Sequence, residues 1–434
     1  MSYEAFRDPH LGFTTKQLHA GYDPSEHYRS KAVPVYQTAA FELGDYDRCV
    51  RLFSYAEEGH SYVRFSNPTT SVLEKRICAL EGASAALALS SGMAAISNTF
   101  LNLACQGGEI VAVKTLYGGS ITLLSSILPQ YGITGRFVED PADPSAYETL
   151  INDKTRAVYL ESLGNPGMNI IDMEAVAAVA HKHGVPLVVD NTFATPFLFR
   201  PFDFGADIVC YSATKYLAGH GTVIGGIAAE KGGFDWFNGR FPQIENFFAD
   251  FKKSVGEEEL RKTLFTKRLR IVYLTDLGAH LSPMSAFFLL QGIETLSLRM
   301  ERHAENAKKI AAFLDSHPAV REVAYAALPK SPYYELAQKY FPRGPGAILS
   351  IRLKGGHKAA LHVLKAVRVF DYMVNVGDAK SLIVHPSSST HFSQTEEERQ
   401  SAGVFDDTLR LSVGIEDIDD LIEDLRQALD SVPS

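Results

Sequence analysis

The chain has 434 residues, which exceeds the usual length of a single domain, so we expect two domains. Hydrophobic residues make up 46% of the chain and charged residues 21%, which is typical of a globular protein with a large core. The formal net charge is -9, with lysine and arginine scattered among aspartate and glutamate. This balance argues against a nucleic-acid partner, because such a partner requires a basic face.

The cysteines show neither metal-binding nor redox spacing, and they are Cys49, Cys78, Cys105 and Cys210. Cys105 and Cys210 stand among apolar residues, where a free thiol behaves as a small hydrophobe. Free thiols indicate a reducing compartment. The N-terminal segment MSYEAFRDPHLGF has early acidic residues and no apolar run, unlike a signal peptide. We expect a soluble, cytoplasmic protein without a membrane partner, since no stretch reaches the roughly 18 apolar residues that span a bilayer.

Residues 1–65 are predicted to form an N-terminal arm. Polar and aromatic residues mix there without sustained periodicity, and AVPVYQTAAF is its one apolar patch. An irregular arm of this length must pack on a surface, either of its own chain or of a neighbouring subunit.

Residues 66–268 show the alternation of strands and helices that is typical of an α/β domain. Asn67 and Pro68 indicate a helix start, because asparagine caps a helix and proline fits its first turn. A second helix is expected over DMEAVAAVAHKHG, between Asp172 and Gly184. Apolar strands are expected at ALAL, EIVAV, AVYLES, PLVVD, DIVCYS and GGIAAE. They predict a mostly parallel central sheet with helices on both faces, in which ligands gather at the carboxyl ends of the strands.

Residues 231–262 interrupt this alternation. The segment FDWFNGRFPQIENFFADFKK is rich in aromatic residues and contains Trp236, the only tryptophan of the sequence. We interpret it as an insertion near the site entrance or at a subunit contact. A structural loop is an equal alternative, because long loops are only sometimes functional.

Residues 269–434 are predicted to form a smaller α+β domain. A long helical stretch, TLSLRMERHAENAKKIAAFLDSH, leads to spaced strands at VREVAYA, AILSIRL and LRLSVGI. Helices are expected between and after these strands.

The strongest functional signal is SATKYLAGHG, which follows the strand DIVCYS. Lys215 lies in the loop that leaves this strand, with Ser212 and Thr214 beside it. Partial burial lowers the pKa of a lysine, so its free amine can attack an aldehyde and form an imine. A lone lysine after a strand is usually a surface residue, so this interpretation requires the rest of a site.

The other strand ends supply groups that match pyridoxal 5'-phosphate (PLP), which has a phosphate, a pyridine nitrogen and a ring face. Gly92 and Met93 open a helix and present backbone N–H groups to an anion. Asp190 ends the strand PLVVD, where a carboxylate can keep the pyridine nitrogen protonated. Tyr117 can lie flat on the ring, and Asn165 can bond its oxygen. Because each group follows a separate strand, we expect them at one edge of the sheet.

Further polar residues lie outside this strand edge. Tyr62 and Arg64 stand at i and i+2 in the arm, and Arg64 could clamp a phosphate, with an ordinary exposed arginine as an equal alternative. Arg410 lies on a strand among apolar residues, where a charge needs a partner. A guanidinium binds the α-carboxylate of an amino acid well. We therefore expect a small amino-acid substrate.

The sequence resembles the Cys/Met-metabolism group of fold-type I PLP enzymes over nearly its full length. The matching segments are QLHAGY, YVRFSNPT, SSGMAAI, YGGS, NPG, VVDNTFATP, SATKYLAGHG and LRLSVGIED. The resemblance implies that Lys215 binds PLP as an imine, that Asp190 meets the pyridine nitrogen and that Tyr117 stacks on the ring. It implies that the phosphate is held by Gly92, Met93, Ser212 and Thr214.

The resemblance also implies an active site shared between subunits. Tyr62 and Arg64 would reach the phosphate of a neighbouring subunit, so the working unit would be at least a dimer and commonly a homotetramer. Arg410 and Asn165, with the backbone near Ser381, would receive the substrate carboxylate. Lys215 would act as the base, and Tyr117 would assist it near the γ position of the substrate.

Within the group, the sequence is most similar to the O-acetylhomoserine sulfhydrylase subfamily. The run NVGDAKSLIVHPSSSTH places Lys380 where relatives that handle cystathionine usually carry glutamate. Gly119 stands where methionine γ-lyases commonly have cysteine. The resemblance implies that O-acetyl-L-homoserine reacts with sulfide or methanethiol to give homocysteine or methionine, together with acetate.

Other functions are alternatives to this one. A cystathionine γ-synthase, a cystathionine γ-lyase or a methionine γ-lyase would share the fold. Members of the group more commonly have arginine at the position of Thr275, and the segment PSSSTH differs from their usual residues. Both departures leave the sulfur donor and the leaving group open. A regulator without catalysis would not need Lys215, Asp190 and Arg410. An aminotransferase would share the first two of these residues but not the contexts YGGS and NVGDAKSL.

Overall fold

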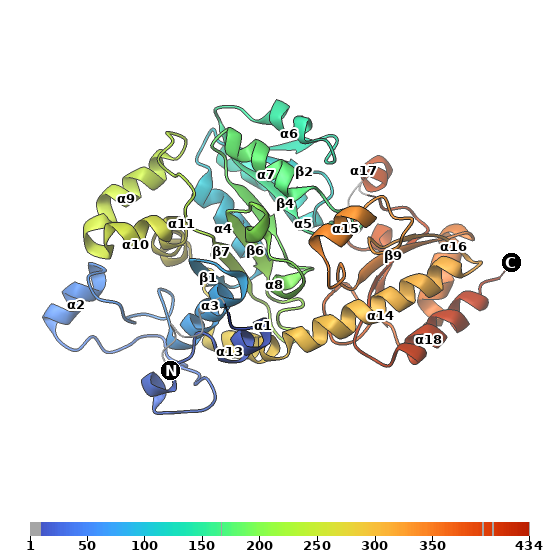
Figure 1. Ribbon diagram of the computed structural model, residues 1–434, viewed down its shortest axis with the longest axis horizontal. Helices are drawn as coiled ribbons and strands as arrows, with labels where there is room; N and C mark the ends of the chain where they lie inside the picture. The colour runs from blue at the N-terminus through green and yellow to red at the C-terminus, as the bar shows by residue number, and fades with distance from the viewer. Residues whose placement is uncertain (1–9, 166, 393–394, 402, 434) are drawn as a thin grey trace.

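The computed structural model describes residues 10–433 except for 166, 393–394 and 402. The first nine residues, which carry most of the expectation about a signal peptide, lie outside this range, as does Pro166 of the motif NPG. Two sheets organise the chain, and a long helix, α14 (Leu296–Ser316), runs from the larger sheet to the smaller one (Figure 1).

The larger sheet has seven strands in the order β1-β7-β6-β5-β4-β2-β3. They are β1 (Ala85–Leu89), β2 (Glu109–Val113), β3 (Thr134–Val138), β4 (Thr155–Glu161), β5 (Leu187–Asp190), β6 (Ile208–Ser212) and β7 (Gly226–Glu230). Neighbouring strands pair in parallel except at β7, which is antiparallel to β1 and β6. The expected mostly parallel sheet is confirmed. The strand GGIAAE, which forms β7, is the antiparallel one, because the chain returns from β6 through a loop and not through a crossover helix.

The strand β3 is missing from the strands that the sequence predicts. Its residues, TGRFV, are mostly exposed or half-buried, because β3 lies at the edge of the sheet beside β2. An edge strand without a continuous apolar run resembles a loop in sequence. The central strands β2, β5 and β7 are buried throughout and carry the apolar runs that made them predictable.

Helices cover both faces of the larger sheet (Figure 1), with α4 packed on β6 and β7 and α7 packed on β5. Between the arm and this sheet's last strand lie α3 (Pro68–Glu81), α4 (Gly92–Leu103), α5 (Gly118–Thr122), α6 (Pro144–Leu150), α7 (Met173–Lys182) and α8 (Thr195–Leu198). In the part of the chain that the structure describes, no helix combines the length and apolar character needed to cross a bilayer.

The predicted helix starts are confirmed at α3 and α7. Asn67 Oδ1 accepts the N–H of Thr69 at 2.9 Å, and α3 ends before Gly82, whose φ of +79° lies in the left-handed region. Asp172 accepts the N–H of Ala175 at 3.4 Å and caps α7. Side-chain caps of this kind satisfy the N–H groups that a helix start leaves without an intrahelical partner.

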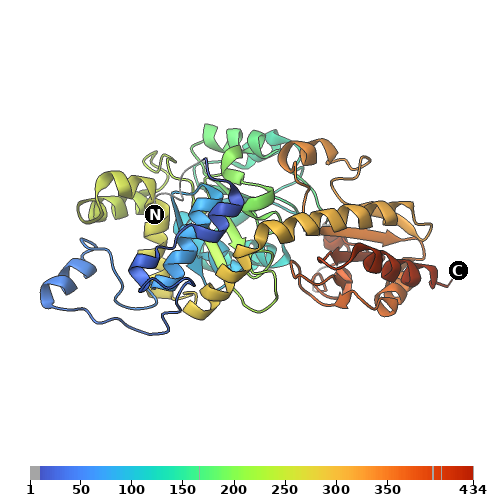
Figure 2. The same ribbon diagram turned by 60° about the horizontal axis from the view of Figure 1, so that its bottom comes forward.

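The arm is less irregular than the sequence predicts. It contains α1 (Phe13–His19), which packs on α3, and α2 (Tyr46–Phe53). The segment that carries α2 extends away from the body of the chain (Figure 2). Both helices span only two turns, which is too short for a hydrophobic period to stand out in the sequence.

The segment at residues 231–262 contributes to the core and is not a loop. Most of it forms α9 (Pro242–Val255) and α10 (Glu257–Lys262). Trp236 is 2% exposed and its ring lies among those of Phe234, Phe241 and Phe265. None of the described residues that line the chain's main pocket comes from this segment, which corrects the interpretation as an insertion at this chain's site entrance.

The smaller sheet has the strand order β10-β11-β12-β9-β8. Its strands are β8 (Val320–Ala324), β9 (Ile348–Leu353), β10 (Asp371–Tyr372), β11 (Leu382–Val384) and β12 (Thr408–Ser412). Only β10 and β11 pair in parallel. The remaining helices are α11 (Leu264–Arg268), α12 (Thr275–Leu277), α13 (Pro283–Glu294), α15 (Tyr334–Tyr340), α16 (Gly356–Ala366), α17 (Glu396–Ser401) and α18 (Ile418–Asp430). The predicted α+β pattern of strands with flanking helices is confirmed.

All four cysteines are free thiols. Cys210 is buried on β6, as the sequence predicts. Cys105 is exposed, which corrects its expected apolar surroundings. It lies in the turn between α4 and β2, where the chain passes over the surface.

The loop after β6 is held in place by a buried arginine of α14. Arg299 is 5% exposed and donates to the carbonyl oxygens of Tyr216 at 2.8 Å and Gly292 at 2.7 Å. These bonds fasten the residue that follows Lys215 to the helix that leads to the smaller sheet. A buried carbonyl that loses its donor raises the free energy of the folded state by about 1–3 kcal/mol.

We predict that Arg299→Leu lowers the free energy of unfolding by about 1–3 kcal/mol, because it removes the buried guanidinium donor of the Tyr216 carbonyl oxygen. Urea denaturation measures this loss. Arg302→Leu is the matched control, since Arg302 lies on the same helix, is half exposed and has Glu305 4.0 Å away. Equal stability of the two variants would contradict the role assigned to Arg299.

Candidate active site

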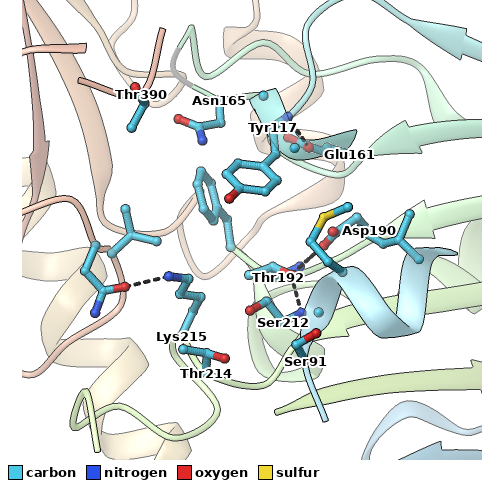
Figure 3. A pocket seen from close by; sticks show the side chains of 18 of the residues that line it. Ser91, Tyr117, Glu161, Asn165, Asp190, Thr192, Ser212, Thr214, Lys215 and Thr390 are labelled. Atoms are coloured by element: carbon cyan, nitrogen blue, oxygen red, sulfur yellow. Dashed lines mark hydrogen bonds between the residues drawn. The ribbon is translucent and has the colours of Figure 1, made fainter. Parts of the chain in front are cut away.

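A pocket of about 430 Å³ lies at the carboxyl ends of the strands of the larger sheet. Its walls come from the segments that follow β1, β2, β4, β5 and β6, and from residues of the smaller sheet's part of the chain. Most of the residues predicted from the sequence line it, namely Gly92, Met93, Tyr117, Asn165, Asp190, Ser212, Thr214, Lys215 and Arg410. Figure 3 shows Tyr117, Asn165, Asp190 and Lys215 around one space.

One end of the pocket is suited to an anion. Gly92 and Met93 are the first residues of α4, where backbone N–H groups have no intrahelical acceptor. Gly92 must lack a side chain, because a Cβ atom there would lie 2.6 Å from Cβ of Ser212. The close contact places the start of α4 against the end of β6. Ser212 and Thr214 therefore border the same space as the helix N-terminus.

A buried carboxylate, that of Asp190, lines the pocket. Asp190 is 9% exposed, and its Oδ1 accepts the N–H of Thr192 at 2.9 Å and the Thr192 hydroxyl at 2.5 Å. Burial raises the pKa of Asp190 to about 6, although the two bonds from Thr192 lower it. The carboxylate therefore lacks a buried cation of its own, and a protonated ring nitrogen would supply one.

A second buried carboxylate, Glu161, lies beside Asp190 in the register of β4 and β5. Burial raises the pKa of Glu161, and the nearby charge of Asp190 raises it further. Glu161 Oε1 also accepts the backbone N–H of Tyr117 at 2.6 Å. This bond fixes the start of the loop that carries the Tyr117 ring over the pocket (Figure 3).

Lys215 points into the pocket from the loop after β6 (Figure 3). Its Nζ donates to Oδ1 of Asn375 at 2.5 Å. Burial lowers the pKa of the Lys215 ammonium, and the positive charge of Arg410 lowers it as well. A lysine in this state is a better nucleophile and base near neutral pH than an exposed one.

Arg410 is 5% exposed and lies on β12 of the smaller sheet. Its Nη1 donates to Asn165 Oδ1 at 3.2 Å, and its Nη2 donates to the carbonyl oxygen of Asn375 at 3.2 Å. The buried Nε has no hydrogen-bond partner. An arginine with neutral partners and a free buried donor is suited to an incoming carboxylate.

Two residues of the arm lie outside this pocket. Tyr62 and Arg64 do not line it, and the Arg64 guanidinium lies 5.4 Å from the ring centroid of Tyr62 and 5.2 Å from that of Phe65. Tyr62 is 40% exposed. The single chain therefore does not bring this pair to its own site.

Ser381, whose neighbouring backbone the sequence predicts beside the substrate carboxylate, is not among the residues that line the pocket. It is fully buried, and its N–H donates to Glu416 Oε1 at 2.6 Å while its hydroxyl donates to Glu416 Oε2 at 2.9 Å. The N–H is thus already bonded to a carboxylate of the same chain. The sequence does not reveal that Glu416 lies opposite Ser381.

Among the polar residues that line the pocket, Glu161, Thr192 and Asn375 were not singled out from the sequence. Glu161 and Thr192 adjoin residues that the analysis did single out, and a polar side chain at a strand end was the available signal. Asn375 belongs to the run NVGDAKS, but neither its spacing nor its type connects it with Lys215. Only the tertiary structure brings these two side chains together.

These groups fit the PLP that the sequence predicts. The anion end, the Asp190 carboxylate and the Lys215 amine match the phosphate, the ring nitrogen and the aldehyde. Asp190 and Arg410 are both buried without a partner of opposite charge, and they match a cationic ring nitrogen and a substrate carboxylate.

Because burial raises its pKa from 3.8 to about 6, Asp190 binds a proton more tightly in the folded chain than in the unfolded chain. Stability without an added ligand should therefore fall as the pH rises through this interval. We predict that Asp190→Asn raises the free energy of unfolding at pH 7.5 by about 2–3 kcal/mol, and that the gain disappears near pH 4. Urea denaturation at both pH values measures it. Asp153→Asn, on the surface, is the control, and a gain independent of pH would contradict the assignment.

Comparison with known proteins indicates the same cofactor, PLP, as the geometry of the pocket. The family model described as Cys/Met metabolism PLP-dependent enzyme matches residues 14–430. A homocysteine synthase of Schizosaccharomyces pombe is 45% identical over 96% of this chain and 98% of its own length. An O-acetyl-L-homoserine sulfhydrylase of Leptospira meyeri is 45% identical over 96% of each chain.

A solved structure is similar over the whole fold. It is a crystal structure from Campylobacter jejuni, assigned to an O-acetylhomoserine (thiol)-lyase and containing N'-pyridoxyl-lysine-5'-monophosphate. It superposes with a TM-score of 0.89 at 38% identity and covers 97% of this chain and all of its own. With the family model matching almost the full length and these relatives well above 30% identity, the chain belongs to the Cys/Met metabolism PLP-dependent enzyme family.

Proposed function

We propose that this enzyme converts O-acetyl-L-homoserine and sulfide into L-homocysteine and acetate, and that methanethiol can replace sulfide to give methionine. The observation that carries the proposal is the placement of Lys215, Asp190 and Arg410 around one pocket. The similar proteins named homocysteine synthase and O-acetyl-L-homoserine sulfhydrylase support the choice of substrate.

In this proposal the pocket binds PLP at its phosphate, its pyridine nitrogen and its ring face. Lys215 carries the cofactor, Asp190 bonds the ring nitrogen and Tyr117 covers the ring face. The phosphate is bound by Gly92, Met93, Ser212 and Thr214. When bound, PLP supplies an electron sink for the charge that remains after a proton leaves the substrate's Cα.

Arg410 and Asn165 hold the substrate in this proposal. The unpartnered Nε of Arg410 offers a buried donor for the α-carboxylate, and the bond between Arg410 and Asn165 Oδ1 orients the guanidinium. Burial lowers the pKa of Arg410 to about 10, so the group keeps its charge at neutral pH. Binding the carboxylate there directs the substrate amine and Cα toward Lys215.

Lys215 moves the protons. Its pKa is lowered by burial and by Arg410, so the free amine can take the Cα proton and return it later in the reaction. Tyr117 is 48% exposed above the pocket, and its hydroxyl is the group we assign to the γ end of the substrate. Acetate leaves from Cγ, and hydrosulfide forms the new carbon–sulfur bond at the same atom.

We also propose that the enzyme is a homotetramer built from dimers that share active sites. Tyr62 and Arg64 are accessible in the arm and would reach the phosphate of a neighbouring subunit. The division into an arm at residues 1–65, a PLP-binding domain at 66–268 and a C-terminal domain at 269–434 belongs to the same proposal. Four free cysteines support a reducing compartment, which we take to be the cytoplasm.

We predict that purified enzyme forms homocysteine rapidly from O-acetylhomoserine and sulfide. Reactions with O-succinylhomoserine in place of the acetyl ester, and with cysteine in place of sulfide, serve as controls. Amino-acid chromatography separates homocysteine from cystathionine. Faster formation or cleavage of cystathionine would reject this function in favour of a cystathionine γ-synthase or γ-lyase.

We predict that Lys215→Ala abolishes covalently bound PLP and reduces homocysteine formation at least about 1,000-fold, because the variant has neither the attachment site nor the base. Mass spectrometry after borohydride reduction measures the attachment. Lys358→Ala, which removes an exposed lysine on α16, is the matched control. Retained turnover in the Lys215 variant would refute the assignment.

A further inference from the structure

The segment at residues 374–377 connects the smaller sheet to the loop of Lys215. It follows β10 and runs along the pocket, which Val374, Asn375 and Val376 line. Gly377 has a φ of +75°, and a Cβ atom there would lie 2.6 Å from the backbone nitrogen of Tyr216. The two backbones are therefore in direct contact, and a side chain at Gly377 would separate them.

The same segment is fixed to the strand that carries Arg410. The Gly377 N–H donates to Ser412 Oγ at 3.1 Å, and Ser412 lies two residues after Arg410 on β12. The carbonyl oxygen of Asn375 accepts Nη2 of Arg410 at 3.2 Å. Asn375 therefore has a main chain that is anchored on the side of the smaller sheet.

The side chain of Asn375 faces the larger sheet. Its Oδ1 accepts Nζ of Lys215 at 2.5 Å, the bond drawn from Lys215 in Figure 3. One residue thus contacts the two cations of the pocket, one through its side chain and the other through its main chain. Lysine side chains rotate freely unless an acceptor fixes the ammonium or amine group.

We propose that Asn375 is a positioning residue that holds the Lys215 amine whenever PLP does not occupy it, and that couples this amine to the Arg410 site. The inference rests on the proposed role of Lys215. The amine is free of the cofactor while the substrate is bound, which is also when it must take and return a proton. A hydrogen-bond acceptor at a fixed position keeps the Lys215 amine near the Cα atom of the substrate while the substrate is bound.

The chemistry of the amide suits this task. A neutral Oδ1 accepts a hydrogen bond from either the amine or the ammonium, whereas a carboxylate would favour the ammonium by its charge. Among the described residues that line the pocket, the other titratable groups facing Lys215 are Tyr117, Glu161, Asp190 and Arg410. The two carboxylates, Glu161 and Asp190, belong to β4 and β5 of the larger sheet. The segment 374–377 contributes a separate, neutral hydrogen-bond acceptor, which is Asn375.

The first experiment measures the pKa of the Lys215 amine in full-length protein from which PLP has been removed. Trace acetic anhydride labels lysines across a pH series, and peptide mass spectrometry quantifies the label on Lys215. We expect Asn375→Asp to raise this pKa by about one unit or more, because a carboxylate replaces a neutral acceptor. Met373→Ala, an exposed side chain nearby, should leave it unchanged. No shift in the aspartate variant would overturn the proposal.

The second experiment uses the PLP-loaded enzyme and glycine, which has no leaving group. Proton NMR in D₂O follows the exchange of the glycine Cα protons, and absorbance gives the glycine affinity. We expect Asn375→Ala to slow exchange about tenfold or more with little change in affinity. Asn375→Asp should move the pH profile of exchange upward by the shift found in the labelling experiment. Exchange at the wild-type rate in the alanine variant would overturn the proposal.

A third variant distinguishes loss of the hydrogen-bond acceptor from a general packing defect. The choice of glycine distinguishes failure of this proposal from failure of the proposed function. Asn375→Ser keeps a short acceptor and should recover part of the exchange rate, whereas a general packing defect would slow both variants equally. Glycine exchange needs neither O-acetylhomoserine nor sulfide. A wild-type enzyme that exchanges glycine protons but forms no homocysteine would therefore reject the proposed function and leave the role of Asn375 intact.

Discussion

The buried guanidinium of Arg299 holds the active-site loop against the helix that joins the two sheets. Its bonds to the carbonyl oxygens of Tyr216 and Gly292 connect the chain after β6 with the end of α13 and the start of α14. Burial lowers the pKa of Arg299 to about 10, so it remains charged at neutral pH while enclosed by protein. The free-energy cost of burying this charge is offset only if the guanidinium N–H groups form hydrogen bonds. Arg299 forms such bonds with the loop that positions Lys215.

Once that loop is fixed, the parallel strands determine what surrounds it. Their carboxyl ends meet at one edge of the sheet, and β2, β4, β5 and β6 each end in or lead into a polar side chain that lines the pocket. Asp190, Glu161 and Arg410 are buried there and Lys215 is partly buried, and burial shifts the pKa of each toward its neutral form. Such a pocket is unfavourable for the chain alone. A ligand with complementary charges restores part of the stability, which is a common trade between stability and function.

The smaller sheet completes the pocket from the opposite side. It supplies Arg410 on β12 and the segment around Asn375, and both touch the groups that follow strands of the larger sheet. The contact between Gly377 and the backbone of Tyr216 makes the two parts meet without a gap. Chemistry at the Cα atom of an amino acid requires the carboxylate site and the base at a fixed separation, and this junction provides it.

Much of the fold and most of the site could be predicted from the sequence, because the signals are local. Buried strands of apolar residues, the caps of α3 and α7, and polar residues directly after strands can be recognised within short windows. These windows identified Lys215, Asp190, Tyr117 and the start of α4. The edge strand β3 was missed because it has no continuous apolar run, and the helices of the arm were missed because two turns are too short to show a period.

The sequence by itself determined the strand-helix pattern and the groups that follow each strand, because these depend on neighbours along the chain. Only the tertiary structure decided the direction of β7, the pairing of Glu161 with Asp190, and the use of the Ser381 N–H by Glu416. It also decided that Asn375 meets Lys215, 160 residues away in sequence. Such contacts depend on how two sheets dock, and docking is set by the summed packing of many side chains that no short window contains.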